Sequence, residues 1–116
     1  MPFTKEFLTH GTAGIPIPVT GTASGAATAL HTAGTSATIK DEVYLFAANP
    51  GTAASVLTVQ FGGTGANFQN TMTITNNAGA YEIIPGWPIA SAGVVSAFST
   101  SAVKPLIFGF VNRITP

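Results

Sequence analysis

Hydrophobic and polar residues alternate along this chain in short runs, and the clearest run covers residues 56–61. Leu57 and Val59 fall on one side of an extended backbone, whereas Thr58 and Gln60 fall on the other. Because successive side chains of a strand point to opposite faces, this alternation predicts a β-strand with one buried face.

Residues 43–48 form a second strong run, in which apolar residues occupy both sides. Tyr44 and Phe46 alternate with aliphatic residues, so we expect this strand to be buried on both faces, within a sheet or against a partner chain. Between the two runs, the Asn, Pro and Gly at 49–51 favour a reversal of the chain. The two strands are therefore predicted to pair as a hairpin.

Shorter strands are predicted over the rest of the chain, separated by turn residues. They span residues 26–31, 71–75, 81–84, 94–98 and 106–114, and residues 83–89 are expected to form a rigid loop or corner. About eight short strands without a long helical crossover predict an all-β fold, an antiparallel β-sandwich with jelly-roll topology. We assign this sandwich domain to residues 26–116.

Residues 1–25 are predicted to form an extended N-terminal arm. Phe3 and Phe7 make its first part apolar enough to dock, although a helical turn and a frayed tail are alternatives. Pro16 and Pro18 interrupt the apolar residues at 15–19. Because proline cannot donate to a strand ladder, this piece is expected to be an edge strand or an extended arm.

Charge sets this sequence apart from most globular domains. The 116 residues include four Lys or Arg and four Asp or Glu, so that charged residues are 7%, against about 25% in an ordinary domain. The hydrophobic share of 46% argues against disorder. Since little self-repulsion would keep free monomers apart, we infer that the protein works in an assembly.

The same composition disfavours several classes of partner. Binding of nucleic acid needs clustered basic residues, and those of this chain are scattered along the sequence. The apolar runs are much shorter than the ~20 residues of a membrane-spanning helix. Cysteine is absent, which removes disulfides and thiolate metal ligands. We therefore expect neither a nucleic acid nor a membrane as partner.

Few residues are suited to catalysis or to holding a cofactor. His10 and His31 are the only histidines, and no carboxylate lies at a metal-ligand spacing from either. The glycines at 62–65 lack the following helix and the lysine of a phosphate-binding loop. We expect a non-enzymatic protein without cofactors. The charge cluster at 40–42 is interpreted as the solvated start of a strand, with an intersubunit salt bridge as the alternative.

Trp87 is the only tryptophan and lies between Pro85-Gly86 and Pro88. A large aromatic side chain at such a place is more often a plug that closes the end of a sandwich. On a rigid loop it can instead serve as a platform for a sugar or as an anchor at an interface. Tyr81, nearby in sequence, would belong to the same contact site.

Five segments of the chain, VYLFAANPG, LTVQFGGTG, YEIIPGWPI, GVVSAF and FGFVNRI, follow one another as strands and turns. In this succession, residues 42–114 resemble the β-sandwich head decoration, or cement, proteins of tailed bacteriophages. The resemblance implies a virion protein on the outer surface of the capsid, commonly a homotrimer, that binds and bridges subunits of the major capsid protein. It implies no catalysis.

On this interpretation, Tyr44, Phe46 and Phe98 line an interface between subunits of the decoration protein. Apolar residues of the arm contact the capsid or a neighbouring subunit, namely Phe3, Phe7, Ile15, Ile17 and Val19. Removal of residues 1–20 is then expected to abolish capsid binding and to leave the sandwich folded.

An alternative function belongs to a different class. The chain would then be a carbohydrate- or receptor-binding module of a phage fibre or tail, with Trp87 and Tyr81 as its contact residues.

Overall fold

The computed structural model describes residues 3–116, which fold into nine β-strands and two single-turn 3-10 helices. The strands are β1 (Phe3–Phe7), β2 (Ile17–Pro18), β3 (Thr28–Thr32), β4 (Lys40–Ala48), β5 (Ser55–Phe61), β6 (Gln69–Ile74), β7 (Tyr81–Ile89), β8 (Val94–Ser99) and β9 (Leu106–Ile114). The 3-10 helices are η1 (Ser24–Ala26) and η2 (Ala66–Phe68). No helix in this part of the chain is long and apolar enough to cross a membrane.

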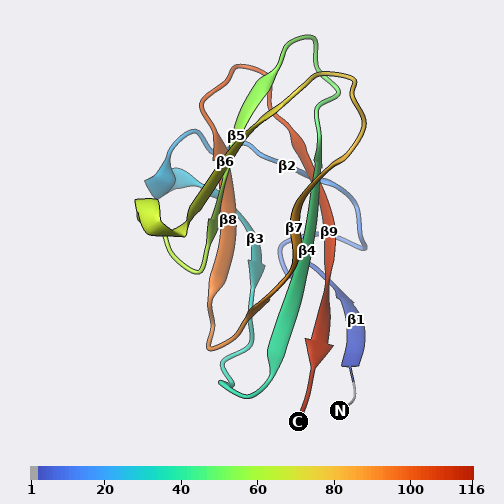
Figure 1. Ribbon diagram of the computed structural model, residues 1–116, viewed down its shortest axis with the longest axis vertical. Coiled ribbons are helices and arrows are strands. Elements are labelled where there is room, and N and C mark those ends of the chain that lie inside the picture. Colours follow the sequence, from blue (N-terminus) through green and yellow to red (C-terminus); the bar gives the residue numbers. More distant parts are fainter. Residues whose placement is uncertain (1–2) are drawn as a thin grey trace.

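The strands form two antiparallel sheets that face each other (Figure 1). Sheet A has five strands, in the order β1-β9-β4-β7 with β2 also paired to β9. Sheet B has four strands, in the order β3-β8-β5-β6. The predicted all-β fold, an antiparallel β-sandwich, is confirmed.

The core lies between the two sheets and follows from the alternation along each strand. In β4, Val43 and Leu45 are buried while their neighbours face outward, and in β5 Leu57 and Val59 are buried from the opposite sheet. Side chains from the two inner faces interdigitate in a layer about 10 Å thick. Each fully buried aliphatic side chain stabilises the fold by roughly 1.5–3 kcal/mol.

The prediction that residues 43–48 and 56–61 pair as a hairpin is wrong. β4 lies in sheet A and β5 in sheet B, so the two strands share no ladder. In this arrangement each strand buries its apolar side against the other sheet, which a hairpin on its own could not do. Asn49 secures the crossing, because its side-chain amide donates to the carbonyl oxygens of Ala53 and Ile74 at 2.8 and 3.0 Å.

The prediction of a rigid loop or corner at residues 83–89 is also wrong, because β7 continues as a strand to Ile89. β7 is an edge strand of sheet A, and only one side of its backbone has to pair, so that it tolerates proline. Pro85 and Pro88 lie in register with residues of β4, and the ladder between β4 and β7 shifts register at two places.

The N-terminal segment lies along the edge of sheet A. The arm expected over residues 1–25 contributes two strands, β1 and β2, which pair with opposite ends of β9. The edge strand expected at 15–19 is confirmed as β2. Leu8 and Val19 are buried in the core, so this segment is anchored by side chains as well as by strand pairing.

Candidate interaction surface

The outward side of sheet A carries a cluster of aromatic side chains. Strand pairing places Phe7 beside Phe110, and Phe110 beside Tyr44, in one row across β1, β9 and β4. The rings of Tyr44 and Phe110 stack, with centroids 4.9 Å apart and planes inclined by 14°. Phe46 and Phe108 form the next row. Phe3 lies four residues before Phe7 on the same side of β1, in register with Ile114. We call these outward aromatic residues of sheet A the aromatic face, and they are Phe3, Phe7, Tyr44, Phe46, Phe108 and Phe110.

Two glycines allow β4 to pack closely against its neighbours beneath these rings. Gly86 of β7 has a φ of +103°, and a Cβ there would lie 2.9 Å from the Tyr44 ring. Gly109 of β9 faces the core, where a Cβ would meet the Leu45 side chain at 2.9 Å and also the backbone of Tyr44. The absence of a side chain at both positions therefore lets the Tyr44 ring and the β4 backbone keep their places.

Much of the aromatic face is open to solvent. Phe3 is 69% exposed, Phe7 62% and Phe108 37%, while the other three members are half-buried. Scattered exposed apolar residues are common in soluble proteins, but a contiguous patch marks an interaction site. The aromatic face is therefore our candidate interaction surface.

The outward side of sheet B is more polar. The hydroxyl oxygens of Thr58 and Thr71 lie 2.9 Å apart across β5 and β6, and Ser96 donates a hydrogen bond to Gln60. Ser24, the first residue of η1, accepts a hydrogen bond from the Gln60 amide and helps to cover it. The two outer sides of the sandwich thus differ in chemistry, and the larger aromatic cluster lies on sheet A.

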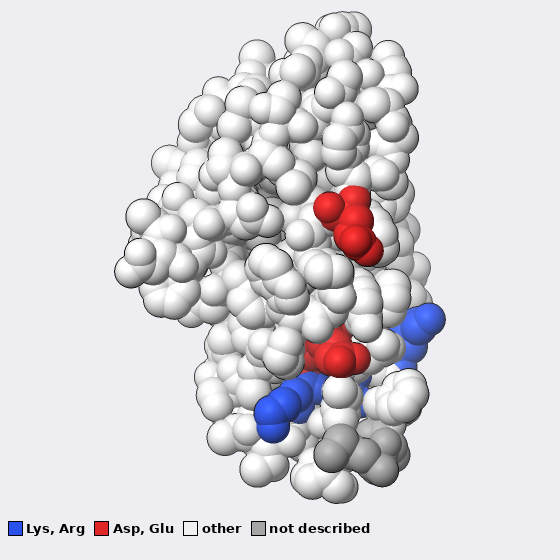
Figure 2. Space-filling model, in the orientation of Figure 1, with Lys and Arg blue, Asp and Glu red and all other residues white. Residues whose placement is uncertain are grey.

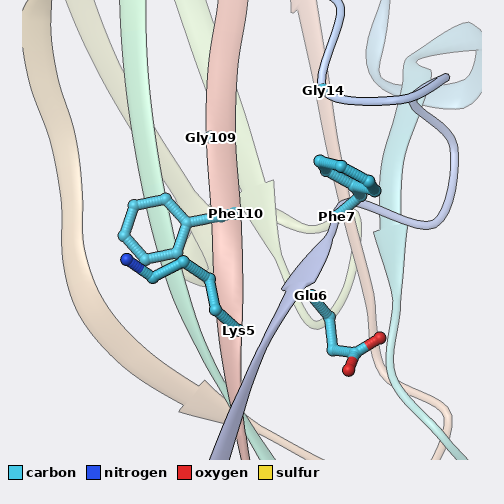
Figure 3. A pocket seen from close by; sticks show the side chains of 6 residues that line it. All are labelled: Lys5, Glu6, Phe7, Gly14, Gly109 and Phe110. Carbon is cyan, nitrogen blue, oxygen red and sulfur yellow. The ribbon is translucent and has the colours of Figure 1, made fainter.

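A hollow of about 460 Å³ opens beside the aromatic face (Figure 3). Figure 3 shows Phe7 and Phe110 on either side of it, with the Lys5 side chain beside the Phe110 ring and the Glu6 carboxylate turned away. Lys5 Nζ is 4.7 Å from the centroid of that ring, a cation–π contact that contributes about 0.5–1 kcal/mol at an exposed site. The hollow is suited to an apolar side chain of a partner, next to one positive charge.

The structure regroups the residues that were predicted to make contacts. Phe3 and Phe7 were expected to contact the capsid or a neighbouring subunit, and Tyr44 and Phe46 to line an interface between subunits. All four lie on the outward side of sheet A. Phe98 lies on the outward side of sheet B, so the structure does not bring it together with the other two expected interface residues.

In the second part of the predicted arm, the exposure of the apolar side chains falls along the chain. Ile15 is 62% exposed, Ile17 is half-buried against the core, and Val19 is fully buried. The expectation that Val19 contacts a neighbouring subunit is wrong, because its side chain is part of this chain's own core. Ile15 is the one of the three that is exposed to solvent.

Trp87 and Tyr81 lie far apart on β7, since six residues along a strand span about 20 Å. Tyr81 packs against the core. Trp87 is 40% exposed, and its ring meets that of Phe61 edge to face with centroids 5.6 Å apart. The interpretation of Trp87 as a buried plug is therefore wrong, and the two residues do not form one contact site.

The charge cluster at 40–42 contains a buried carboxylate. Asp41 is 1% exposed, accepts a hydrogen bond from Arg113 Nε at 2.9 Å, and lies 2.7 Å from His31 Nε2. Burial alone would raise the pKa of Asp41, but the hydrogen bonds from Arg113 and His31 outweigh burial and hold this pKa below its usual value. For Asp41, the interpretation as a solvated strand start is wrong, because the carboxylate is buried. The alternative of an intersubunit salt bridge is also wrong, because its partners belong to the same chain.

His31 is fully buried, and both of its ring nitrogens have partners. Nδ1 accepts the backbone N–H of Thr9 at 3.2 Å, and Nε2 faces Asp41. No nitrogen is left to deprotonate a nucleophile or to bind a metal, so the pair holds structure together. His10 lies apart and exposed, with Nε2 3.0 Å from Thr32 Oγ1. Within residues 3–116, no three His, Cys, Asp or Glu residues gather as metal ligands would.

Phe108 and Phe110 belong to the aromatic face but were not singled out from the sequence. Alternation over residues 106–114 places both on one side of a strand, yet the opposite side is also largely apolar. The pattern alone therefore does not tell which side is outward. Strand pairing decides it, because the two residues lie beside the outward residues Phe46 and Tyr44 of β4.

Comparisons of the chain with protein-family models, with curated proteins and with solved structures find no match. A function is therefore inferred from the fold and from the chemistry of the aromatic face.

Proposed function

We propose that the protein is a non-enzymatic structural component of a virion, which decorates the outer surface of a bacteriophage capsid by binding subunits of the major capsid protein. The observation that carries this proposal is the aromatic face. A free monomer leaves that surface in water, whereas an assembled shell buries it.

Burial of the aromatic face stabilises an assembly. Moving one exposed Phe side chain out of water contributes roughly 1.5–3 kcal/mol. Phe3, Phe7 and Phe108 are the most exposed members, so together they supply several kcal/mol before the entropy of association is subtracted. A gain of this kind suits a lasting contact, because obligate interfaces resemble a domain core cut in half.

The edge of sheet A offers a second contact surface. β1 pairs with β9 on one side, and no strand within residues 3–116 pairs with its other side. An edge of this kind presents backbone groups to which a neighbouring chain adds a strand. In a closed trimer each copy contacts the next through two different surfaces, and the β1 edge and the aromatic face provide such a pair. We therefore include a homotrimer in the proposal.

The jelly-roll topology belongs to the same proposal. It is supported by the strand order, β2-β9-β4-β7 in one sheet and β3-β8-β5-β6 in the other, since a jelly roll has eight strands in two sheets. Within residues 3–116, β5 and β6 are the only consecutive strands that pair with each other. The other connections between β2 and β9 cross from one sheet to the other, as the double Greek key of a jelly roll requires.

The low charge of the chain also fits a permanently assembled protein. Figure 2 shows that charged side chains are sparse on the face in view and absent from its upper third. With four basic and four acidic residues, electrostatic repulsion between copies is weak. Many copies can therefore pack closely on a shell with little electrostatic repulsion between them.

The proposal is tested with two matched double variants. Phe7→Ser with Phe108→Ser removes two exposed rings of the aromatic face. Val56→Ser with Val94→Ser is the control, since both valines are 40% exposed and lie in sheet B. Each protein is measured by light scattering for its solution mass, and by co-sedimentation with undecorated capsids of the phage that encodes it.

The wild type and the control are expected to form trimers and to sediment with capsids, whereas the aromatic-face variant is expected to be a folded monomer that stays in the supernatant. The proposal is contradicted if the wild-type protein is monomeric at every concentration and does not sediment with capsids. Equal capsid binding by all three proteins would exclude the aromatic face as the contact surface.

A further inference from the structure

A second hollow, of about 380 Å³, lies where the edges of the two sheets meet. β7 forms the edge of sheet A, and β6, with η2 before it, forms the edge of sheet B. The lining residues are Phe61, Asn67, Phe68, Gln69, Asn70 and Trp87. Its volume falls in the range of about 300–1,000 Å³ that is usual for small-molecule sites.

Two rings in this hollow are exposed and held in place by the protein itself. Trp87 is 40% exposed and is fixed by its edge-to-face contact with Phe61. Phe68 is 47% exposed, and its ring lies against the backbone at Gly63, where a Cβ would come within 2.9 Å of it. Rings that are already ordered lose little entropy when a ligand packs on them.

The polar groups of the hollow are neutral amides. Within residues 3–116, the side chains of Asn67 and Asn70 make no hydrogen bond to another protein group, while Gln69 donates to the carbonyl oxygen of Thr64 at 3.3 Å. Each free amide offers two donor hydrogens and one acceptor oxygen. The hollow thus combines apolar ring surfaces with unused donors and acceptors.

The absence of charge in the lining narrows the ligand class. Lys, Arg, Asp and Glu are all missing from the lining residues, so a phosphate or a carboxylate finds no counter-charge and a cation finds no acidic ligand. A sugar in its pyranose form has an apolar face of C–H groups and a rim of hydroxyl groups, and it needs no counter-charge.

We propose that this hollow binds a neutral saccharide, with a pyranose ring packed on the exposed rings of Trp87 and Phe68 and its hydroxyl groups hydrogen-bonded to Asn67 and Asn70. The site goes beyond the proposed assembly function and does not compete with it. β7 and β1 lie at opposite ends of the strand order of sheet A, so the hollow and the β1 edge are separate surfaces.

Trp87 provides a direct probe, because it is the only tryptophan of the chain. Its fluorescence is followed while neutral hexoses, N-acetylhexosamines and their short oligomers are added up to about 10 mM, a range that covers millimolar dissociation constants. A saturable change in emission is expected with at least one neutral sugar. Glucuronic acid and glucose 6-phosphate serve as charged comparisons, and neither is expected to bind more tightly than its neutral counterpart.

The double variant Asn67→Ala with Asn70→Ala is expected to weaken binding by a factor on the order of ten or more and to keep the wild-type unfolding midpoint. Asn112→Ala, on β9 and away from the hollow, is the matched control and should bind as the wild type does. The proposal is overturned if no neutral sugar changes the emission. It is also overturned if the double variant binds as tightly as the control.

Discussion

His31 of β3 and Asp41 of β4 are joined by a contact of 2.7 Å between Nε2 and Oδ2, which links sheet B to sheet A. Because His31 Nδ1 accepts the backbone N–H of Thr9, the proton of the neutral ring lies on Nε2 and is donated to Asp41. Arg113 of β9 donates to the same carboxylate. Three side chains from three strands thus fasten the two sheets to each other.

Replacement of Asp41 by Asn is expected to lower the free energy of unfolding at neutral pH by roughly 2–4 kcal/mol, because a buried amide cannot satisfy both Arg113 and His31. The pKa of Asp41 is lowered in the folded protein, so its contribution is complete above the unfolded-state pKa of about 3.9 and is lost as pH falls through the folded-state pKa. The difference between wild type and variant should therefore narrow below about pH 4. Urea unfolding of both proteins at several pH values measures this difference in the free energy of unfolding.

Glu42→Gln is the matched control for this experiment. Glu42 is the next residue of β4, and its half-buried side chain faces outward. We expect its replacement to change the free energy of unfolding by less than about 0.5 kcal/mol. An Asp41→Asn variant as stable as Glu42→Gln at neutral pH would show that the network contributes nothing to stability.

Replacement of Gly109 by Ala is expected to destabilise the fold by roughly 1–3 kcal/mol. The new Cβ would collide with the Leu45 side chain and with the backbone of Tyr44, which cannot move without breaking the ladder between β4 and β9. Gly25→Ala is the control, because a Cβ there meets nothing within 4 Å. Thermal unfolding of both variants measures the difference, and equal midpoints would mean that the two strands can separate at little cost.

The sequence predicts the strands well because alternation is a local property. The strand expected at 106–114 matches β9 residue for residue, and the runs at 43–48 and 56–61 fall within β4 and β5. Pairing is not local. The turn residues at 49–51 suit both a hairpin and a crossing between sheets, so the hairpin prediction failed while its two strands were correct.

The contact residues are predicted only in part, for a related reason. Tyr44 and Phe46 were identified because both sides of their strand are apolar, and Phe3 and Phe7 because they are apolar residues of the predicted arm; all four face outward. Val19 has the same local signature and is buried, because exposure depends on what packs above a residue and not on its neighbours in sequence.

Removal of residues 1–7 is expected to abolish assembly and to leave a folded protein. It removes β1, whose five residues are all exposed, together with two rings of the aromatic face, and it keeps Leu8 in the core. Removal of residues 1–20 also takes away Leu8 and Val19, and losing two core side chains costs roughly 4 kcal/mol or more. The earlier expectation that the sandwich survives this longer truncation is therefore revised, and we now expect it to unfold.

Circular dichroism and light scattering distinguish the two truncations. The shorter one should keep a β-sheet spectrum with a cooperative unfolding transition and have the mass of a monomer. A trimer formed without residues 1–7 would show that neither β1 nor its two phenylalanines take part in assembly.

High salt is expected to leave the assembly intact. The outward side of sheet A also carries four charged residues, two of each sign, namely Lys5, Lys40, Glu42 and Glu82. Electrostatic attraction between copies is therefore the rival explanation of assembly, against apolar contact. The two explanations differ in their response to salt. The Debye length falls from about 30 Å at 0.01 M to about 3 Å at 1 M, which weakens exposed ion pairs, whereas sulfate strengthens the burial of apolar surface.

Light scattering should therefore show the same trimer in dilute buffer and in concentrated sodium chloride, and a lower dissociation constant of the trimer in ammonium sulfate. If the trimer dissociates in sodium chloride, the charges around the aromatic face and not its rings hold the copies together.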